Sequence, residues 1–376
     1  ILDAPLVANA TEYPYTLYRG EALGMRAFMH FDLVRLFAAQ YTVNPAAGGI
    51  PYATEFSLKT PEFESLAKNY EHIVADLLEA EALLADEEDY AGSGNFMLDR
   101  QIHFNLHAVR ATLARVYLTM GNNEMAALYA QKVISGGKFS LKEKTEVVND
   151  LAGVLSRKET IFGIYFPGFY TNVSGKLQQV TSYYSLDLRD DFMELYEMDA
   201  SVLDFRTMAY FSNSGVGDDV KYRLCKLTDI YELNNMPSDR PAELILGVNL
   251  IRLPEMYYIA CEACGLGDDA AEYINLVRNK RGISRAKDVT CDTDEQRVVA
   301  LNKEYRKEFY GEGQYFWFLK THGVTGTLAH SPETTLAQEN FIFPLPDAEV
   351  EYGWAQDDKE NEEGSEEPAG EVIPKG

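Results

Sequence analysis

The chain has 376 residues, 46% of them hydrophobic and 25% charged, which is enough material for one large globular domain or two. Its 34 basic and 59 acidic residues give a formal net charge of −25, which argues against binding to nucleic acid or to an anionic membrane surface. No apolar run of about 18 residues is present, so the sequence predicts no transmembrane segment.

The first predicted element is an amphipathic helix from Glu21 to Phe37, with leucine, phenylalanine and valine side chains on one broad face. The loop that follows contains two prolines and two adjacent glycines, so it cannot be helical throughout. It places Tyr41 and Asn44 on a constrained loop, where recognition groups are common. A second long helix is predicted from Pro61 to Leu84, with Thr60 as its N-cap.

Pairs of amphipathic helices then recur along the chain. Residues 101–135 contain two helices that meet at Gly121, and residues 250–283 contain two more, joined by a glycine-containing turn. A helix from Glu295 to Tyr310 begins a third unit. Because this spacing matches a tetratricopeptide-like repeat of about 34 residues, we predict a mainly α fold of tetratricopeptide-like helix pairs, an α-α superhelix.

The residue pattern is different between the helix pairs at 101–135 and 250–283. Residues 156–250 carry alternating and aromatic segments, which predict a loop-rich region containing short strands. One helix is expected to interrupt this region, from Asp190 to Met198. Phe341 to Pro346 contains prolines and is predicted to be a short extended segment.

We expect these parts to form a single domain over residues 1–355. Its helical repeat scaffold would span 21–140 and 250–320, and its variable, loop-rich, ligand-facing region would span 141–249. Residues 356–376 are acidic and almost free of apolar side chains, so we predict a flexible, solvated tail.

Cysteine and histidine patterns suggest a metal or redox site only weakly. Cys261 and Cys264 form a CxxC, but both fall on the apolar stripe of a predicted helix, which favours buried core thiols. His103 and His107 would share a helix face, yet no third ligand is evident, so we interpret them as polar or half-buried side chains. The sequence therefore predicts no metal and no cofactor.

Three acidic residues, Glu304, Glu308 and Glu312, recur at four-residue spacing. A glycosidase needs two carboxylates that face each other across a cleft, about 5 to 10 Å apart, and carboxylates stacked along one helix do not. We therefore expect structural roles for them, such as bonds to loops or to arginine side chains. No nucleophile elbow, phosphate loop or dinucleotide-binding glycine motif appears, and we predict that the protein is not an enzyme.

Binding a sugar without cleaving it requires flat aromatic surfaces for its C–H faces and amide, carboxylate or guanidinium groups for its hydroxyls. The loop-rich region is dense in aromatic residues, and several flank the polar loop TNVSGK. Any one of them could equally be a core residue, and we expect Tyr165 and Phe166 to be a core pair. The candidate ligand-binding residues are Tyr41, Asn44, Phe169, Tyr170, Tyr183, Tyr184 and Tyr210.

The chain contains, in this order, EALGMRAFMHFDLVRLFAAQY, the repeat-like helix pair at 108–135, NLIRLPEMYYIACEA, INLVRNKRGI, EYRKEFYGEG and FIFPLP. This series resembles SusD/RagB-type proteins, the surface glycan-binding lipoproteins of Bacteroidetes nutrient-uptake systems, from about Glu21 to Pro346. The resemblance implies a lipid-anchored lid at the outer-membrane surface, above a TonB-dependent transporter of SusC type. Family members usually start with a lipidated cysteine, which is not in this sequence, and they often carry Arg where this chain has Gln314.

Our first hypothesis is therefore a non-catalytic cell-surface protein that captures oligosaccharide or polysaccharide fragments and delivers them to a SusC-type transporter. One alternative is a carbohydrate-active enzyme such as a glycoside hydrolase. Another is a RagB-like scaffold that binds peptides, or a repeat scaffold that binds only protein.

Overall fold

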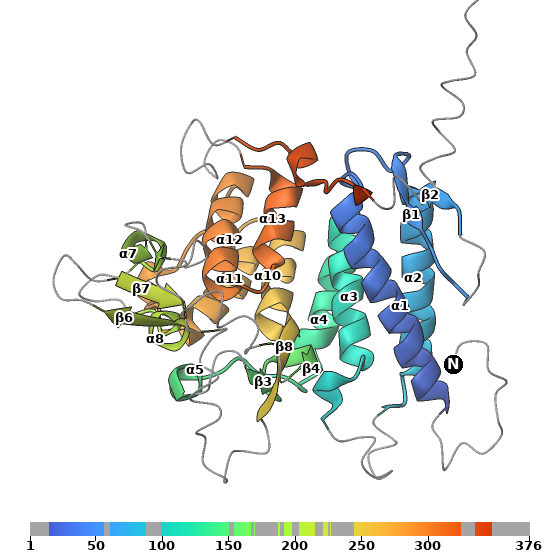
Figure 1. Ribbon diagram of the computed structural model, residues 1–376. Helices are drawn as coiled ribbons and strands as arrows, with labels where there is room; N and C mark the ends of the chain where they lie inside the picture. Colours follow the sequence, from blue (N-terminus) through green and yellow to red (C-terminus); the bar gives the residue numbers. More distant parts are fainter. Residues whose placement is uncertain are drawn as a thin grey trace, which may run out of the picture.

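The computed structural model describes residues 15–55, 61–87, 99–149, 154–166, 169, 187–188, 192–197, 203–214, 221–224, 226, 244–324 and 335–347. Within these ranges the chain is mainly helical with few short strands, which confirms the predicted fold class. Figure 1 shows the helices side by side, from α1 (Tyr15–Phe37) and α2 (Leu66–Leu83) to α11 (Asp268–Lys280) and α12 (Asp294–Glu308). None of the described helices is long and apolar enough to cross a membrane.

The first two helices, α1 and α2, pack against each other. α1 begins at Tyr15, earlier than the predicted Glu21. The predicted start of the second helix is wrong, because α2 begins after Pro61, with Ser65 as its N-cap. The hydroxyl of Ser65 accepts a hydrogen bond from the backbone N–H of Lys68, as an N-cap should.

A short strand takes the place of the predicted first helical turn. β2 (Phe63–Ser65) pairs antiparallel with β1 (Gly48–Pro51), which lies in the loop after α1. The buried side chain of Asn69 holds β1 in place, because its amide makes hydrogen bonds of 2.7 Å to both the N–H and the carbonyl of Ile50. This pairing satisfies backbone groups that a helix starting at residue 61 would leave without partners.

The helix hairpins follow the predicted repeat pattern. α3 (Leu106–Thr119) and α4 (Asn123–Ser135) meet at Gly121, whose φ of +74° is a conformation that glycine adopts without strain. α10 (Leu253–Ala263) packs against both α4 and α11, so successive hairpins stack on each other. α13 (Gln314–His322) packs against α12 and completes the helical scaffold.

Two small antiparallel sheets accompany the helices. The first has the strand order β3-β8-β4, and its strands are β3 (Val154–Ser156), β4 (Thr160–Tyr165) and β8 (Leu244–Arg252). The second has the order β5-β7-β6, and its strands are β5 (Asp187–Leu188), β6 (Phe211–Ser214) and β7 (Lys221–Leu224). Because β8 runs directly into α10, the first sheet joins the loop-rich region to the scaffold.

The other described elements are short. They are α5 (Lys144–Asn149), α7 (Phe192–Leu195), α8 (Arg206–Tyr210), η3 (Arg100–Ile102), η5 (Arg285–Lys287) and η7 (Gln338–Phe341). The helix predicted from Asp190 to Met198 is represented by α7. The segment predicted to be extended begins inside η7, at Phe341, and continues without regular secondary structure to Pro346. The predicted acidic tail lies outside the described residues.

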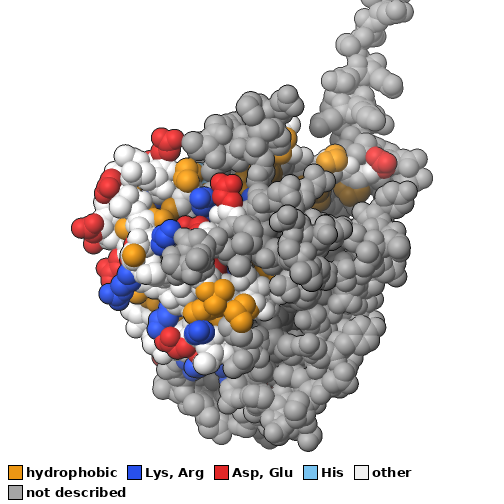
Figure 2. Space-filling view, turned by 90° about the vertical axis from the view of Figure 1, so that its left-hand side faces the viewer, with side chains coloured by type: hydrophobic (Ala, Val, Ile, Leu, Met, Phe, Trp, Pro, Cys, Tyr) orange, Lys and Arg blue, Asp and Glu red, His pale blue; other side chains and the backbone are white. Residues whose placement is uncertain are grey.

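One continuous core runs through the helical scaffold, and a smaller cluster lies in the loop-rich region. In the main core, the rings of Phe28, Phe104 and Phe162 lie 4.9 to 5.8 Å apart and join α1 to β4. The smaller cluster consists of Leu195, Tyr196, Tyr210, Phe211 and Leu224. The face that carries this second cluster shows, where it is described, interspersed acidic and basic side chains and a small group of apolar ones (Figure 2).

The prediction that Tyr165 and Phe166 form a core pair is wrong. Their side chains are 57% and 46% exposed. β4 buries its first four residues and exposes the last two, so Tyr165 lies beyond the packed part of the sheet and Phe166 follows it. Alternating hydrophobicity does not show where a strand leaves the layer that covers it.

Candidate functional site

Two of the predicted ligand-binding residues, Tyr41 and Asn44, lie on the loop after α1. The partly buried ring of Tyr41 packs on the ring of Tyr70, with centroids 4.7 Å apart. Asn44 is exposed, and its Oδ1 accepts a hydrogen bond of 3.1 Å from the Ala46 backbone N–H. The loop is therefore shaped by its own contacts and presents Asn44 to solvent.

The remaining predicted ligand-binding residues belong to the loop-rich region. Tyr210 is only 6% exposed, and its hydroxyl donates a hydrogen bond of 3.4 Å to Glu308, so its ring offers little surface to a ligand. Phe169 is half-buried, with its ring 6.1 Å from that of Phe166. Tyr170, Tyr183 and Tyr184 lie outside the described residues.

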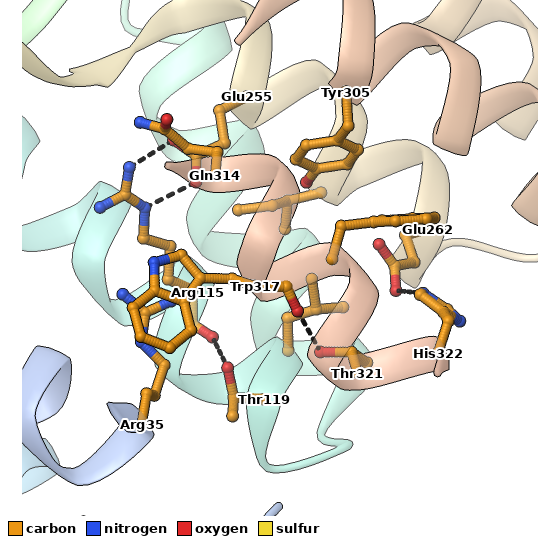
Figure 3. A pocket seen from close by; sticks show the side chains of 13 residues that line it. Arg35, Arg115, Thr119, Glu255, Glu262, Tyr305, Gln314, Trp317, Thr321 and His322 are labelled. Carbon is orange, nitrogen blue, oxygen red and sulfur yellow. Dashed lines mark hydrogen bonds and ion pairs between the residues drawn. The ribbon is translucent and has the colours of Figure 1, made fainter. Parts of the chain in front are cut away.

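A small polar pocket lies next to the loop after α1 (Figure 3). Its volume is about 40 Å³, and its walls come from α1, α3, α10, α12 and α13. Lys320 of α13 donates hydrogen bonds to the carbonyls of Arg35 and of Ala38, where the loop begins. The turn after α3 touches the same loop, since a Cβ on Gly121 would lie 3.1 Å from Cγ2 of Thr42. The pocket and the predicted recognition loop are therefore neighbours.

Two buried guanidinium groups form the polar wall of this pocket. Arg115 of α3 makes a bidentate ion pair with Glu255 of α10, with Nε–Oε1 and Nη2–Oε2 distances of 2.7 and 2.5 Å. Arg35 of α1 pairs with Asp32, and its guanidinium carbon lies 4.0 Å from the ring centroid of Trp317 on α13. The pocket thus combines an aromatic ring with fixed, charged hydrogen-bonding groups.

Some polar atoms of the pocket lining have no hydrogen-bond partner among the described residues. The donor Nε of Arg35 and the acceptor Oε1 of Gln314 are both buried without a hydrogen bond to any described protein group. Such groups in a native fold call for water or for a ligand. Elsewhere in the lining, Nε2 of His322 lies 2.9 Å from Oε1 of Glu262. The cavity has room for a few waters or for one edge of a larger ligand.

Lys320 fixes the geometry beside the pocket at an electrostatic cost. Its side chain is 2% exposed, and it donates hydrogen bonds to the backbone carbonyls of Arg35 and Ala38. Burial, and then the nearby positive charge of Arg35, lower the pKa of Lys320 from 10.5 to about 8. The charged form of Lys320 is therefore less stable in the folded protein than in the unfolded chain, although it still predominates at pH 7.

We expect the Lys320→Met substitution to change how stability depends on pH. Because the folded pKa lies below the unfolded one, the unfolded chain binds more protons between about pH 8 and 10, and the wild-type protein gains stability there. The difference in unfolding free energy between wild type and variant should rise by on the order of 2 kcal/mol over this window. Urea unfolding at pH 7, 8.5 and 10 measures it. The control is Lys68→Met, at an exposed position. If the stability difference from wild type changes no more with pH for Lys320→Met than for Lys68→Met, the expectation is refuted.

The predicted structural role fits Glu304 and Glu308, at the end of α12, and Glu312, which follows the helix. Glu308 lies within 3.2 Å of the guanidinium groups of Arg206, Arg252 and Arg281. These contacts belong to a buried ion network that joins the loop-rich region to the scaffold. Its described cations are Arg206, Lys226, Arg252, Arg278, Arg281 and Lys307, and its described carboxylates are Glu159, Glu197, Asp204, Glu304, Glu308 and Glu312.

The cysteine and histidine pairs were the sequence candidates for a metal or redox site. Cys261 is buried and Cys264 half-buried, both at the main core, in line with the prediction. His103 and His107 do not share a helix face, contrary to the prediction, because Asn105 caps α3 and leaves His103 outside it. In the described part of the chain, no three His, Cys, Asp or Glu side chains are placed to hold a metal ion.

A second cavity, of about 450 Å³, lies between α1, β1 and the C-terminal extended segment. Its lining is mostly apolar and includes Leu33, Phe63 and Leu345. Both ring nitrogens of its His30 are engaged by backbone groups. It therefore offers few partners for a hydroxyl-rich ligand.

The key pocket residues Arg35, Arg115 and Trp317 were missed by sequence reasoning. All three lie on helices that the periodicity assigns to the scaffold, whereas recognition groups were sought in loops. One signal was available for Arg35, which interrupts the apolar stretch FDLVRLF. Because arginine is almost never fully buried unless it is paired, an arginine within an apolar helix face indicates a buried partner.

Two family models match different parts of the chain. A model described as "Starch-binding associating with outer membrane" matches residues 6–118, and a model described as the SusD family matches residues 210–371. The SusD-like protein P38 of Formosa agariphila is 22% identical over 394 residues, covering 90% of this chain and 73% of that protein. The SusD-like protein P2 of the same organism is 31% identical over 176 residues, covering 45% of this chain and 31% of that protein.

Solved structures share the fold. A SusD superfamily protein from Bacteroides thetaiotaomicron superposes with a TM-score of 0.69 at 24% identity, covering 93% of this chain and 79% of that one. A SusD-like carbohydrate binding protein from Bacteroides vulgatus superposes with a TM-score of 0.65 at 17% identity, covering 95% and 80%. At these identities the likeness establishes the fold alone.

Proposed function

The chain belongs to the SusD family, and from this premise we propose that it is a non-catalytic cell-surface protein that captures oligosaccharides. It would pass them to a TonB-dependent transporter of SusC type in the outer membrane. The helices would serve as a rigid frame, and the ligand would bind at the loop after α1 and the adjoining pocket.

The observation that carries this proposal is the composition of the pocket beside that loop. Trp317 supplies an aromatic ring, Arg35 and Arg115 supply guanidinium groups, and Gln314 supplies an amide. Asn44 presents a further amide from the loop. Sugar recognition uses this combination, since rings contact C–H faces and fixed polar groups bind hydroxyls.

The state of the carboxylates supports binding without cleavage. A glycosidase needs one carboxyl group that can give up a proton and another that can act as base or nucleophile. In the pocket, Glu255 is committed to Arg115 and Glu262 to His322. Neither arrangement leaves a carboxyl pair free to face a glycosidic bond.

The proposed location and partner rest on the family. SusD-like proteins are carbohydrate-binding proteins of the outer membrane, and a lipid anchor would hold this chain at the cell surface. A SusC-type transporter would lie beneath it and receive the ligand. Co-purification of a tagged form from its native membrane tests this part, and recovery without any such transporter would count against it.

Affinity electrophoresis with a panel of embedded polysaccharides tests the binding function. We expect at least one glycan to retard the wild-type protein. Trp317→Ala should weaken that interaction about tenfold or more, because an aromatic anchor contributes more than about 1.4 kcal/mol to such complexes. Tyr41→Ala tests the loop in the same way.

The matched control is Phe63→Ala, which removes a 46% exposed ring from the apolar cavity. It should leave the retardation unchanged, and circular dichroism melting should show that each variant folds. If Phe63→Ala weakens binding and Trp317→Ala does not, the ligand binds elsewhere. Retardation by no glycan would favour a peptide-binding or protein-binding scaffold.

A further inference from the structure

The charge balance of the pocket limits the kind of sugar it can take. Its lining contains Arg35 and Arg115, and each guanidinium already has its own carboxylate partner, Asp32 and Glu255. The side chains of Arg115 and Glu255 are 7% and 6% exposed, so this pair is almost completely removed from water. No arginine in the described lining remains without a counter-charge.

Other charges near the pocket do not change this balance. Lys320 faces backbone carbonyls beside Arg35, and Glu262 adds a carboxylate next to His322. Counting Lys320 with the two arginines gives three positive charges, and Asp32, Glu255 and Glu262 give three negative ones. The three positive and three negative charges of these six groups therefore balance.

An acidic sugar would be poorly accommodated here. A uronate carboxylate or a sulfate would have to be buried without an uncompensated cation, or would have to displace Asp32 or Glu255, and both routes are unfavourable. The net charge of −25 would also repel such a ligand as it approaches. A hydroxyl group has no such penalty, because it can both donate and accept a hydrogen bond.

The atoms left without partners have the character that a hydroxyl requires. Nε of Arg35 is a donor and Oε1 of Gln314 is an acceptor, and both are buried in residues that are 8% and 6% exposed. Gln314 is held in place by the bond of 3.2 Å from its Nε2 to the carbonyl of Leu250. An amide oxygen presented in this way accepts a hydrogen bond from a hydroxyl and repels a carboxylate.

We infer that this pocket selects neutral oligosaccharides, whose hydroxyl edge it binds, and rejects uronate-containing or sulfated ones. This inference rests on the proposed function and adds the substrate class. The selectivity comes from arginines that each already have a carboxylate partner, and not from an absence of arginines.

Isothermal titration with two matched sets of oligosaccharides tests the inference. The neutral set would contain gluco-, xylo-, manno- and fructo-oligosaccharides of six units, and the acidic set oligogalacturonate, oligoalginate and a sulfated galactan fragment. We expect a neutral ligand to bind, and every acidic ligand to bind at least tenfold more weakly. Gln314→Leu should weaken the neutral complex about tenfold.

Asp32→Asn provides the decisive comparison, because it releases Arg35 from its carboxylate. Asp32 is 38% exposed at its side chain, so the change should be tolerated by the fold, and a melting curve checks this. We expect the variant to bind oligogalacturonate at least tenfold more tightly than wild type, with the gain lost in high salt. Exposed Asp294→Asn, which also removes an i,i+3 partner of an arginine, is the matched control and should produce no gain.

The outcomes separate the two proposals. Tight binding of an acidic glycan by wild type, weakened by Trp317→Ala, would overturn the selectivity and leave glycan capture intact. An Asp32→Asn variant that folds and gains no affinity for the acidic ligand would likewise contradict the neutralised-arginine argument. If the wild-type protein binds no ligand of either set, glycan capture itself is overturned, and the selectivity with it.

Discussion

Replacing Glu308 by glutamine should lower the unfolding free energy by about 3 to 5 kcal/mol, a large part of the stability of a typical domain. Glu308 is completely buried and lies within 3.2 Å of Arg206, Arg252 and Arg281. The amide keeps the volume but removes the charge, so three buried guanidinium groups lose part of their compensation. An unpaired buried charge costs more than the ion pair contributed.

The pH dependence gives a second signature of the same residue. Burial alone would raise the pKa of Glu308, but Arg281 and Arg252 outweigh it and hold the pKa well below 4.5. A carboxylate with a lowered folded pKa stabilises the protein above its unfolded pKa and loses this contribution as the pH falls. The difference between wild type and Glu308→Gln should therefore be full at pH 7 and shrink below about pH 4.5.

Urea unfolding at pH 7 and at pH 4 measures both effects. Glu124→Gln, at an exposed position of α4, should change the unfolding free energy by less than about 0.5 kcal/mol. A Glu308→Gln protein as stable as this control at pH 7 would show that the network is tolerant of charge loss.

Replacing Arg206 by methionine should open the loop-rich region locally and leave the helical scaffold folded. Arg206 is completely buried; it contacts both carboxylate oxygens of Asp204 and reaches Glu304 and Glu308 at 2.8 and 3.2 Å. The apolar cluster around Tyr196 is small, so this network supplies much of the attachment between the two parts. Its loss should lower the local opening free energy by about 3 to 5 kcal/mol.

Hydrogen exchange read by mass spectrometry can follow this local opening. Peptides covering 203–214 should exchange faster in Arg206→Met, whereas peptides covering α3 and α4 should not change. The double variant Asp204→Leu, Arg206→Met should recover part of the protection, because it removes the stranded carboxylate together with its partner. Uniformly faster exchange over the whole chain would mean that the region does not open as a separate unit.

The helix pairs could be predicted from sequence because each rule acts locally. The apolar period, the small residues and Gly121 all agree on the α3–α4 hairpin, and no distant contact competes with them. The start of α2 could not be predicted in this way. It depends on Asn69, whose amide binds Ile50 nineteen positions earlier and favours a strand over a helical turn.

The candidate site was only partly predictable, because its residues meet through the packing of five helices. Tyr41 and Asn44 were found from the constrained loop that carries them. The pairing of Arg115 with Glu255 spans 140 positions, and nothing in the local pattern of either helix indicates it. The same limit applies to Tyr210, whose aromatic character suited a ligand but whose ring is buried beside Glu308.

The most direct test of capture without cleavage is one calorimetric titration of the purified protein with a neutral oligosaccharide, followed by mass analysis of the sugar recovered from the cell. The expected result is saturable binding that Trp317→Ala weakens about tenfold or more, with every recovered sugar at its original length. Shortened sugar, or binding that does not depend on Trp317, would contradict the account.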